Sequence, residues 1–320
     1  MEAKKIQPTR KNRLLGCFYG VAIGDALGAP FEFIHAEPKL KYDGLLVKVP
    51  VIVPFRFHNM IIKPSYPTDD TEMTMALLDS ILKSKDHKTY SRDVAITSYL
   101  KWANQKETPM GKNTRALMKG VTTLKGFENR LAKLTDDYCQ SAQSNGSLMR
   151  CTPFILLSKD KWEEASDIDV SLTNNNDINR TCSKIYINLL RHIIYKEKIN
   201  CYLQKGLEIK VYIKYALERK IINVSKNKGW VVYALYVTLI TFFHTDTYQE
   251  GMNFIMENFA SGDTDTLMAI AGGLMGAYYS LDDMKKDPKT AKNISTIRQV
   301  FAGETDRLYY QTIINFEDSI

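Results

Sequence analysis

Residues 261–280, SGDTDTLMAIAGGLMGAYYS, join two kinds of sequence that together decide how this chain folds. The first part interleaves two carboxylates, Asp263 and Asp265, with threonine hydroxyls, and the second part has apolar and small residues at helical spacing. Glycine inside a helix costs roughly 1 kcal/mol relative to alanine, so the glycines of this stretch indicate close packing. The pattern predicts a buried helix with hard oxygen ligands at its N-terminal tip. A plain capping role for either Asp is the alternative.

A second glycine pattern lies near the start of the chain, in residues 14–30, LLGCFYGVAIGDALGAP. Its glycines recur at every fourth position, which places them on one stripe of a helix where another backbone can pack. Pro30 prevents the helix from continuing. Glu32 then follows between two phenylalanines, where a carboxylate is either half-exposed at the surface or partly buried and functional.

Composition and periodicity indicate an all-α protein. The 320 residues are 44% hydrophobic and 25% charged, which allows one large core. We expect a single compact orthogonal helical bundle over residues 1–320, with a flexible basic tail at 1–12 and an extended, non-helical insertion at 35–66. Helical patterns cover residues 91–105, 114–120, 178–193, 207–219, 230–243, 252–259 and, as a last helix, 294–310. Any β-structure is expected in the insertion, which is rich in Val, Ile and Pro.

Charge and cysteine content exclude several classes of protein. The net charge is +7, but the basic residues are scattered, so we expect no sequence-specific nucleic-acid binding. Five cysteines without a Cys-x-x-Cys pair indicate free thiols in a reducing compartment, the cytoplasm, with the nucleus left open. The apolar run 230–243 is shorter than the ~20 residues that cross a bilayer, so we expect no membrane contact. We also expect a monomer.

A second acidic helix start lies at residues 67–75, PTDDTEMTM. Here Thr68, Asp69 and Asp70 precede an amphipathic helix, much as Asp263 and Asp265 do in the first stretch. A helix start can use one capping carboxylate but has no structural use for two. Oxygen ligands without His or Cys suit Mg²⁺ or Mn²⁺. If the two tips converge, they would form a two-metal site with ions roughly 3.5–4 Å apart.

These stretches resemble the ADP-ribosylglycohydrolases, relatives of the dinitrogenase-reductase-activating glycohydrolase. The resemblance rests on four ordered blocks and a weaker fifth: GVAIGDALGAPFEF (20–33), PTDDT (67–71), SNGSLMRCTPFIL (144–156), SGDTDTLMAIAGGLMGA (261–277) and PMGKNTRAL (109–117). The blocks together extend over roughly residues 14–279.

The resemblance implies an all-helical fold with two Mg²⁺ or Mn²⁺ ions at its centre. The implied metal ligands are Glu32, Thr68, Asp69, Asp70, Asp263, Asp265 and Thr266. Glu32 also matches the family's catalytic glutamate, and Asp25 would support the site from behind. The residues implied to hold the ADP-ribose of the substrate are Asn145, Gly146 and Ser147, which alone would indicate a simple Asn-Gly turn. Met149 and Arg150 are expected to pack and fix that loop.

The implied reaction is hydrolysis of the bond between C1″ of ADP-ribose and a modified protein side chain, which reverses ADP-ribosylation. Arginine is the favoured target, with serine, O-acetyl-ADP-ribose and poly(ADP-ribose) left open. The partner is then an ADP-ribosylated protein or a small molecule that contains ADP-ribose. Two other readings stay open: an ADP-ribose-binding protein without turnover, and a two-metal phosphohydrolase that releases AMP.

The chain departs from the family pattern in three places. Asn174 follows Thr173 where members often carry a histidine, and Ser261 replaces a common glycine. The insertion at 35–66 matches nothing in the pattern, and it could serve as a lid or a docking surface.

Overall fold

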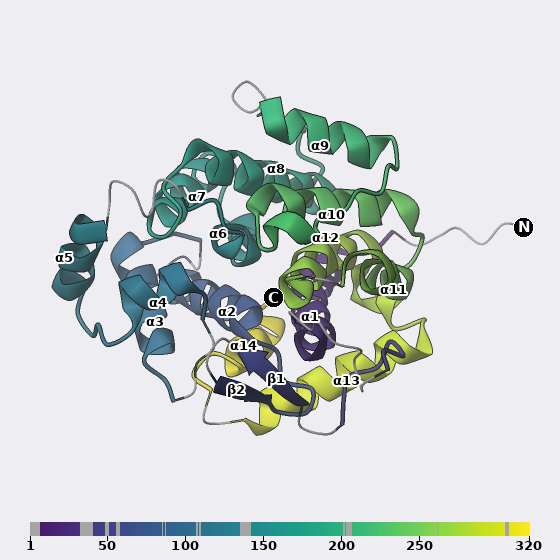
Figure 1. Ribbon diagram of the computed structural model, residues 1–320, viewed down its shortest axis with the longest axis horizontal. Helices are drawn as coiled ribbons and strands as arrows, with labels where there is room; N and C mark the ends of the chain where they lie inside the picture. Colours follow the sequence, from purple (N-terminus) through teal and green to yellow (C-terminus); the bar gives the residue numbers. More distant parts are fainter. Residues whose placement is uncertain are drawn as a thin grey trace, which may run out of the picture.

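The computed structural model describes residues 7–32, 41–48, 51–55, 58–84, 86, 88–106, 108, 110–134, 142–200, 202, 207–260, 262–304 and 307–320. Helices dominate this part of the chain, which confirms the all-α prediction (Figure 1). The α-helices are α1 Arg10–Gly28, α2 Asp69–Leu82, α3 Arg92–Ala103, α4 Lys112–Met118, α5 Leu124–Leu134, α6 Gly146–Met149, α7 Trp162–Ser171, α8 Asp177–Tyr195, α9 Leu207–Leu217, α10 Val231–His244, α11 Tyr248–Phe259, α12 Thr264–Met284, α13 Pro288–Gly303 and α14 Gln311–Ser319. Short 3₁₀ helices are η1 Ala29–Phe31, η3 Thr152–Leu156 and η4 Ser225–Asn227.

The closest helix pair in the bundle is α1 with α12, and it lies inside the ring formed by the other helices (Figure 1). A methyl group built on Gly20 would overlap the carbonyl oxygen of Gly272, and one on Gly24 would overlap that of Met268. The predicted close approach along both glycine stripes is therefore confirmed. Because the two helices run alongside each other in this way, the C-terminal end of α1 lies beside the N-terminal tip of α12, where Gly28 faces Asp265.

We expect Gly20→Ala to destabilise the protein strongly. The added methyl has no room against the backbone of α12, and overpacking of a tight interior typically costs about 1–3 kcal/mol or more. Gly303→Ala, at the end of α13, is the matched control, because nothing lies within 4 Å of a methyl group at that position. Urea unfolding of the two variants measures the difference. Equal midpoints for Gly20→Ala and the wild type would contradict the packing described here.

Residues Arg10–Phe31, which include helix α1, also meet the length and hydropathy of a membrane span, but their most apolar 18-residue window is entirely buried in the protein. Helix α1 is therefore a core helix of the bundle, although its length and hydropathy also fit a membrane span. Three cysteines of the described residues, Cys17, Cys151 and Cys182, are free and buried, as the sequence predicts. Burial raises the pKa of each of these thiols, so they are poor nucleophiles.

The predicted insertion contains the two strands of the described structure, β1 Val51–Phe55 and β2 His58–Ile62. They form an antiparallel hairpin in which Val51 pairs with Ile62 and Phe55 with His58. β-Structure therefore lies where the sequence analysis expects it. Residues 35–40, 49–50 and 56–57 of the insertion are outside the described residues.

Two predicted boundaries are wrong. The tail expected at 1–12 ends earlier, because Thr9 caps α1 through its hydroxyl, which accepts from the Asn12 amide, and residues 10–12 are helical. Residues 1–6 are outside the described residues. The last helix, expected at 294–310, is α13, which begins earlier and ends at Gly303, and a further helix, α14, follows from Gln311. Asp287 caps α13 by accepting from the Thr290 amide at 2.8 Å, with Pro288 in the first turn. This Asp-Pro pair is a helix-start signal that the sequence analysis did not use.

Candidate functional site

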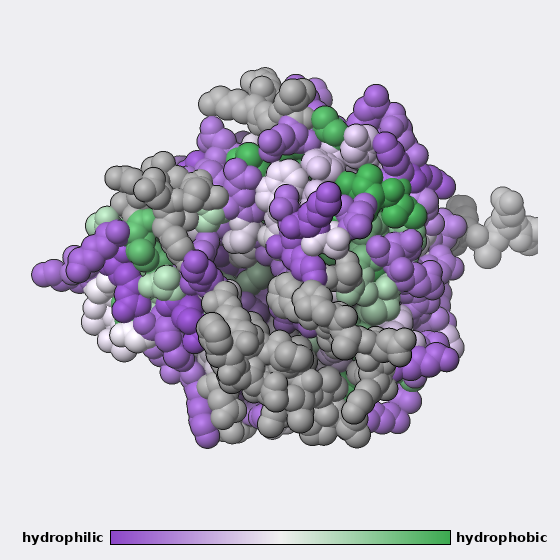
Figure 2. Space-filling model, viewed as in Figure 1, coloured by the Kyte–Doolittle hydropathy of each residue, from purple (hydrophilic) through white to green (hydrophobic). Residues whose placement is uncertain are grey.

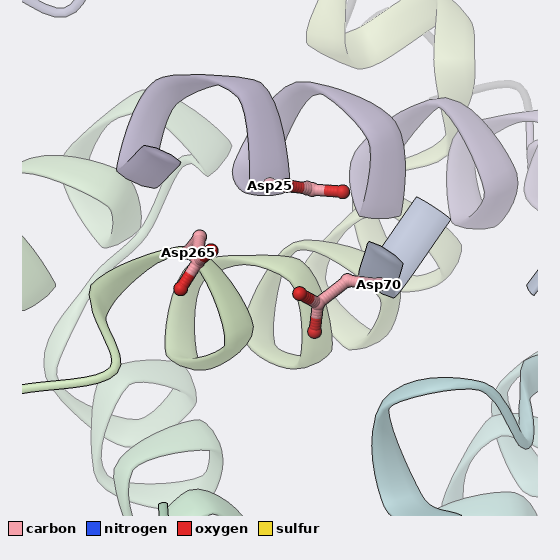
Figure 3. A group of neighbouring side chains, drawn as sticks. All are labelled: Asp25, Asp70 and Asp265. Carbon is pink, nitrogen blue, oxygen red and sulfur yellow. The ribbon is translucent and has the colours of Figure 1, made fainter. Parts of the chain in front are cut away.

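The acidic tips of α2 and α12 meet in the structure. The Thr266 hydroxyl lies 3.3 Å from Asp70 Oδ2, and the Thr68 hydroxyl lies 3.3 Å from Asp265 Oδ2. Oxygen atoms of Asp25, Asp70 and Asp265 all lie within 4.8 Å of one another, and the three side chains come from three different helices (Figure 3). The convergence on which the two-metal prediction depends is therefore present.

Asp25 of α1 holds the start of α2. Its carboxylate accepts from the Thr68 amide at 2.9 Å, from the Thr71 amide at 2.9 Å and from the Thr68 hydroxyl at 2.8 Å. Thr68 occupies the N-cap position of α2, yet its side chain makes no capping bond to its own helix. Asp25 therefore does the capping from outside the helix, as its expected supporting role requires.

Asp263 and Glu32 form the second half of the cluster. Oxygen atoms of Glu32, Asp263 and Asp265 lie within 4.8 Å of one another. Asp263 stands at the N-cap position of α12, but its side chain makes no capping bond and instead accepts from Asn145 Nδ2 at 2.8 Å. The simple capping alternative thus fails for Asp263.

The cluster has a buried side and an open side. Asp70 and Asp265 are fully buried, whereas Glu32, Asp69 and Asp263 are half-buried. A ligand can therefore reach the cluster from the side of Glu32, Asp69 and Asp263. Figure 2 shows that the face in view is hollowed near its middle, in the region where Figure 1 draws α2 and α6.

Burial makes the charged forms of these carboxylates costly. Burial, together with the nearby carboxylates of Asp25 and Asp263, raises the pKa of Asp69 to about 8. Burial also raises the pKa values of Asp70 and Asp265 well above their usual range, and their acidic neighbours add to both shifts.

The donor set fits a divalent cation. Among the described residues, Asp70 Oδ1 is buried without a hydrogen-bond partner, which is costly unless something else binds it. Carboxylate and threonine oxygens around such an orphaned atom are the ligands of a hard cation, and positive charge would offset the repulsion among the carboxylates. The acidic groups of this site can therefore bind metal.

The loop before α6 brings Asn145 to the cluster. The Asn145 amide donates to the Gly229 carbonyl at 2.9 Å while its side chain reaches Asp263. Gly229 has a φ of +79°, and a side chain there would come within 3.1 Å of Asp263 Oδ2. Only glycine fits both conditions. The sequence analysis did not predict a role for Gly229. The signal that could have pointed to it is the Gly-Trp pair directly before α10.

Residues 6–305 match the sequence family of the ADP-ribosylglycohydrolases. This chain belongs to that family. Like its named relatives, it is an ADP-ribosylglycohydrolase, an enzyme that hydrolyses a glycosidic bond of ADP-ribose.

Two relatives and one solved structure illustrate the likeness. The chain is 26% identical over 315 residues to the ADP-ribosyl-(dinitrogen reductase) glycohydrolase of Rhodospirillum rubrum, over 92% of this chain and 96% of the relative. It is 26% identical over 288 residues to the ADP-ribosylarginine hydrolase Tri1 of Pseudomonas putida (strain GB-1), over 85% of this chain and 72% of the relative. A structure described as an ADP-ribosylglycohydrolase-related protein complex has the same fold, with a TM-score of 0.66 at 22% identity, over 96% of this chain and 99% of the other.

Within this ADP-ribosylglycohydrolase, the loop residues Gly146 and Ser147 have different surroundings. A side chain at Gly146 would meet nothing within 4 Å in the described structure, so open space adjoins this position. Ser147 is fully buried, and its hydroxyl accepts from Asn179 Nδ2 at 2.9 Å. The Ser147 hydroxyl thus supports the loop from behind.

Asn174 is buried and holds the same loop in place. Its Nδ2 donates to the Ala142 carbonyl at 2.8 Å and to Ser144 Oγ at 3.1 Å. Its Oδ1 accepts from the Thr173 hydroxyl, to which Arg150 donates. Arg150 is itself buried in an ion pair with Asp169 at 2.9 Å, which agrees with the loop-fixing role expected for it.

Proposed function

We propose that this ADP-ribosylglycohydrolase removes ADP-ribose from modified arginine side chains of proteins. The observation that carries the proposal is the meeting of two acidic helix tips with Glu32 beside them, on the open side of the cluster. The names of the two relatives, one acting on dinitrogen reductase and one on ADP-ribosylarginine, support a protein substrate and an arginine linkage.

The site as we propose it holds two Mg²⁺ or Mn²⁺ ions. Their ligands would be Glu32, Thr68, Asp69, Asp70, Asp263, Asp265 and Thr266, all of which lie at or beside the converging tips. When bound, such ions supply positive charge that orients the 2″ and 3″ hydroxyls of the distal ribose and makes water easier to deprotonate.

Glu32 would carry the proton transfer. Burial raises the pKa of Glu32 well above its usual range, and the carboxylates of Asp263 and Asp69 add to the shift, which favours the protonated form of this side chain. In the reaction, water adds to C1″, the bond from C1″ to the guanidinium nitrogen breaks, and a proton passes to the departing arginine. The remaining carboxylates stabilise the positive charge that develops on the ribose ring.

The loop of Asn145, Gly146 and Ser147 would hold the ADP-ribose, with the Ser147 hydroxyl bound to Asn179 on its buried side. Asn145 is fixed by Gly229 and Asp263, and Gly146 adjoins open space. A reducing compartment and a monomeric state complete the proposal, supported in the first case by the free thiols of Cys17, Cys151 and Cys182.

The test is incubation of the protein with peptides that carry ADP-ribose on arginine or on serine, with Mg²⁺ or with EDTA. We expect release of free ADP-ribose from the arginine peptide, at a rate that falls to background in EDTA. Release from the serine peptide alone would correct the linkage. Release of AMP would favour a phosphohydrolase, and binding of ADP-ribose without release from either peptide would favour a reader. Chromatography of the products separates the three release outcomes, and a titration with ADP-ribose identifies the reader.

A further inference from the structure

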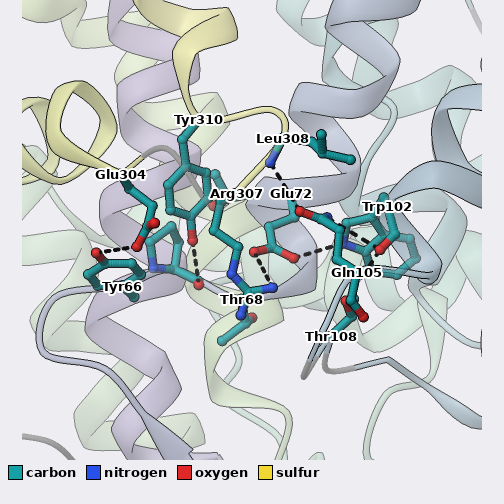
Figure 4. Close-up of polar contacts among 12 residues, drawn as sticks. Tyr66, Thr68, Glu72, Trp102, Gln105, Thr108, Glu304, Arg307, Leu308 and Tyr310 are labelled. Atoms are coloured by element: carbon teal, nitrogen blue, oxygen red, sulfur yellow. Dashed lines mark hydrogen bonds and ion pairs between the residues drawn. The ribbon is translucent and has the colours of Figure 1, made fainter.

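The family match ends at residue 305, yet the chain that follows packs against the start of α2. Residues 307–310, between α13 and α14, contact both α2 and α3 (Figure 4). The tip of α2 carries three of the proposed metal ligands, Thr68, Asp69 and Asp70. This C-terminal segment therefore touches the site from outside the family's matched region.

Tyr310 makes the contact nearest to the site. It is buried, and its hydroxyl donates to the Pro67 carbonyl at 3.2 Å. That carbonyl and the Thr68 amide belong to one peptide group, and the Thr68 amide donates to Asp25. The peptide group that carries Thr68 is therefore held from both sides, by Asp25 at its N–H and by Tyr310 at its C=O.

Arg307 adds a second contact one turn further along α2. Its Nη1 lies 3.4 Å from Glu72 Oε1, and Glu72 Oε2 accepts from Trp102 Nε1 of α3 at 2.7 Å. Glu72 is almost fully buried, so the ion pair lies where solvent screens it little. These bonds fix the rotation of the first turn of α2 relative to α3.

Adjacent residues of the same segment hydrogen-bond to α3 and to the residues that directly follow it. The Tyr309 hydroxyl donates to the Ser98 carbonyl at 2.9 Å, and the Leu308 amide donates to Gln105 Oε1 at 3.0 Å. Tyr309 is buried like Tyr310. The segment thus presents two neighbouring buried tyrosines whose hydroxyls each donate to a backbone carbonyl, of which one holds the ligand-bearing peptide and the other binds α3. Their surroundings differ in charge, because Glu72 and Arg307 lie near Tyr310.

We propose that Tyr310 is a positioning residue for the metal site, which sets the orientation of Thr68 and Asp70 through the Pro67–Thr68 peptide group. This inference rests on the metal site of the proposed function. Without the hydroxyl, the peptide group is fixed only by Asp25 and can tilt, which moves the Thr68 oxygen away from Asp265 and Asp70. Such a displacement should weaken metal binding, because the contacts behind a metal ligand set its orientation.

The experiment compares Tyr310→Phe with Tyr309→Phe in the full chain, by calorimetric titration with MnCl₂ and by urea unfolding. Each change removes one buried hydroxyl that donates to a backbone carbonyl, so we expect similar losses of stability. For Tyr310→Phe we also expect Mn²⁺ affinity to fall by about threefold to tenfold, the range that one hydrogen bond allows. For Tyr309→Phe we expect Mn²⁺ affinity to match the wild type.

The outcomes separate the inference from the proposal beneath it. Equal Mn²⁺ affinities in the wild type and Tyr310→Phe would overturn the positioning role while leaving the metal site in place. Equal weakening in both variants would also overturn it, because the effect would then be general loss of structure. A wild-type protein that binds no Mn²⁺ would overturn the metal site and this inference together.

Discussion

Asp265→Ala is expected to abolish metal binding and turnover together. Asp265 belongs to both groups of converging carboxylates, and Thr68, Asp70 and Glu32 all lie around it. Loss of residues that merely support a ligand costs about 10–100-fold in metal affinity, so loss of a ligand itself should exceed about 100-fold. Titration of the variant with MgCl₂ and MnCl₂ by calorimetry measures the affinity directly.

The metal-free form of this variant should be at least as stable as the metal-free wild type. Burial and neighbouring carboxylates raise the pKa of Asp265, which means that its charged form is costly in the folded protein. Asp287→Ala is the matched control, because Asp287 also begins a helix and accepts from the Thr290 amide. It should lose about 1 kcal/mol of stability and no metal affinity. If Asp265→Ala instead behaved like Asp287→Ala, Asp265 would be a capping residue only.

Glu32→Gln is expected to bind ADP-ribose but to lose about 10²–10⁴-fold in kcat. The amide keeps an oxygen at the same position and cannot take up or release a proton, so it removes the transfer step and leaves binding in place. Calorimetry measures the ADP-ribose affinity of the variant, and steady-state turnover of the arginine-modified peptide gives its kcat.

Two results would contradict the role given to Glu32. Turnover near the wild-type rate would take Glu32 out of the chemistry. Loss of ADP-ribose affinity in proportion to kcat would assign Glu32 to binding, as a ligand of the site without a proton to transfer. The Mn²⁺ titration of the same variant shows whether the metal site is intact.

The sequence predicts local structure well where the spacing of residues depends on the geometry of a single helix. The four-residue glycine spacing correctly indicates the close contact of α1 with α12, because that spacing is a property of one helix surface. The single helix expected at 294–310 is wrong because apolar residues continue on both sides of the break after Gly303. The earlier start of α1 depends on the Thr9 cap, which lies in a stretch judged by its charge alone.

The functional site is harder to predict from sequence patterns than the helices are. Periodicity places Asp70 and Asp265 at helix tips but says nothing of whether two tips meet, and only the resemblance to a family supplied that step. Gly229 and Tyr310 escape notice because their roles come from partners far away in the chain, at Asp263 and Pro67. In the sequence, Asn174 is a departure from the family motif. In the structure, its buried side chain donates to Ala142 and Ser144 and so holds their loop in place.

The pairing of α1 with α12 also bears on how the chain is made. Thr264, at the start of α12, bonds to Phe31 across 233 residues of sequence. At about 5–20 residues per second on the ribosome, the first helix emerges at least on the order of 10 s before the helix that covers it. During that interval an apolar segment as hydrophobic as a membrane span has no permanent partner. Protection of the nascent chain, by early packing against other helices or by a chaperone, is thus a requirement that this topology places on the cell.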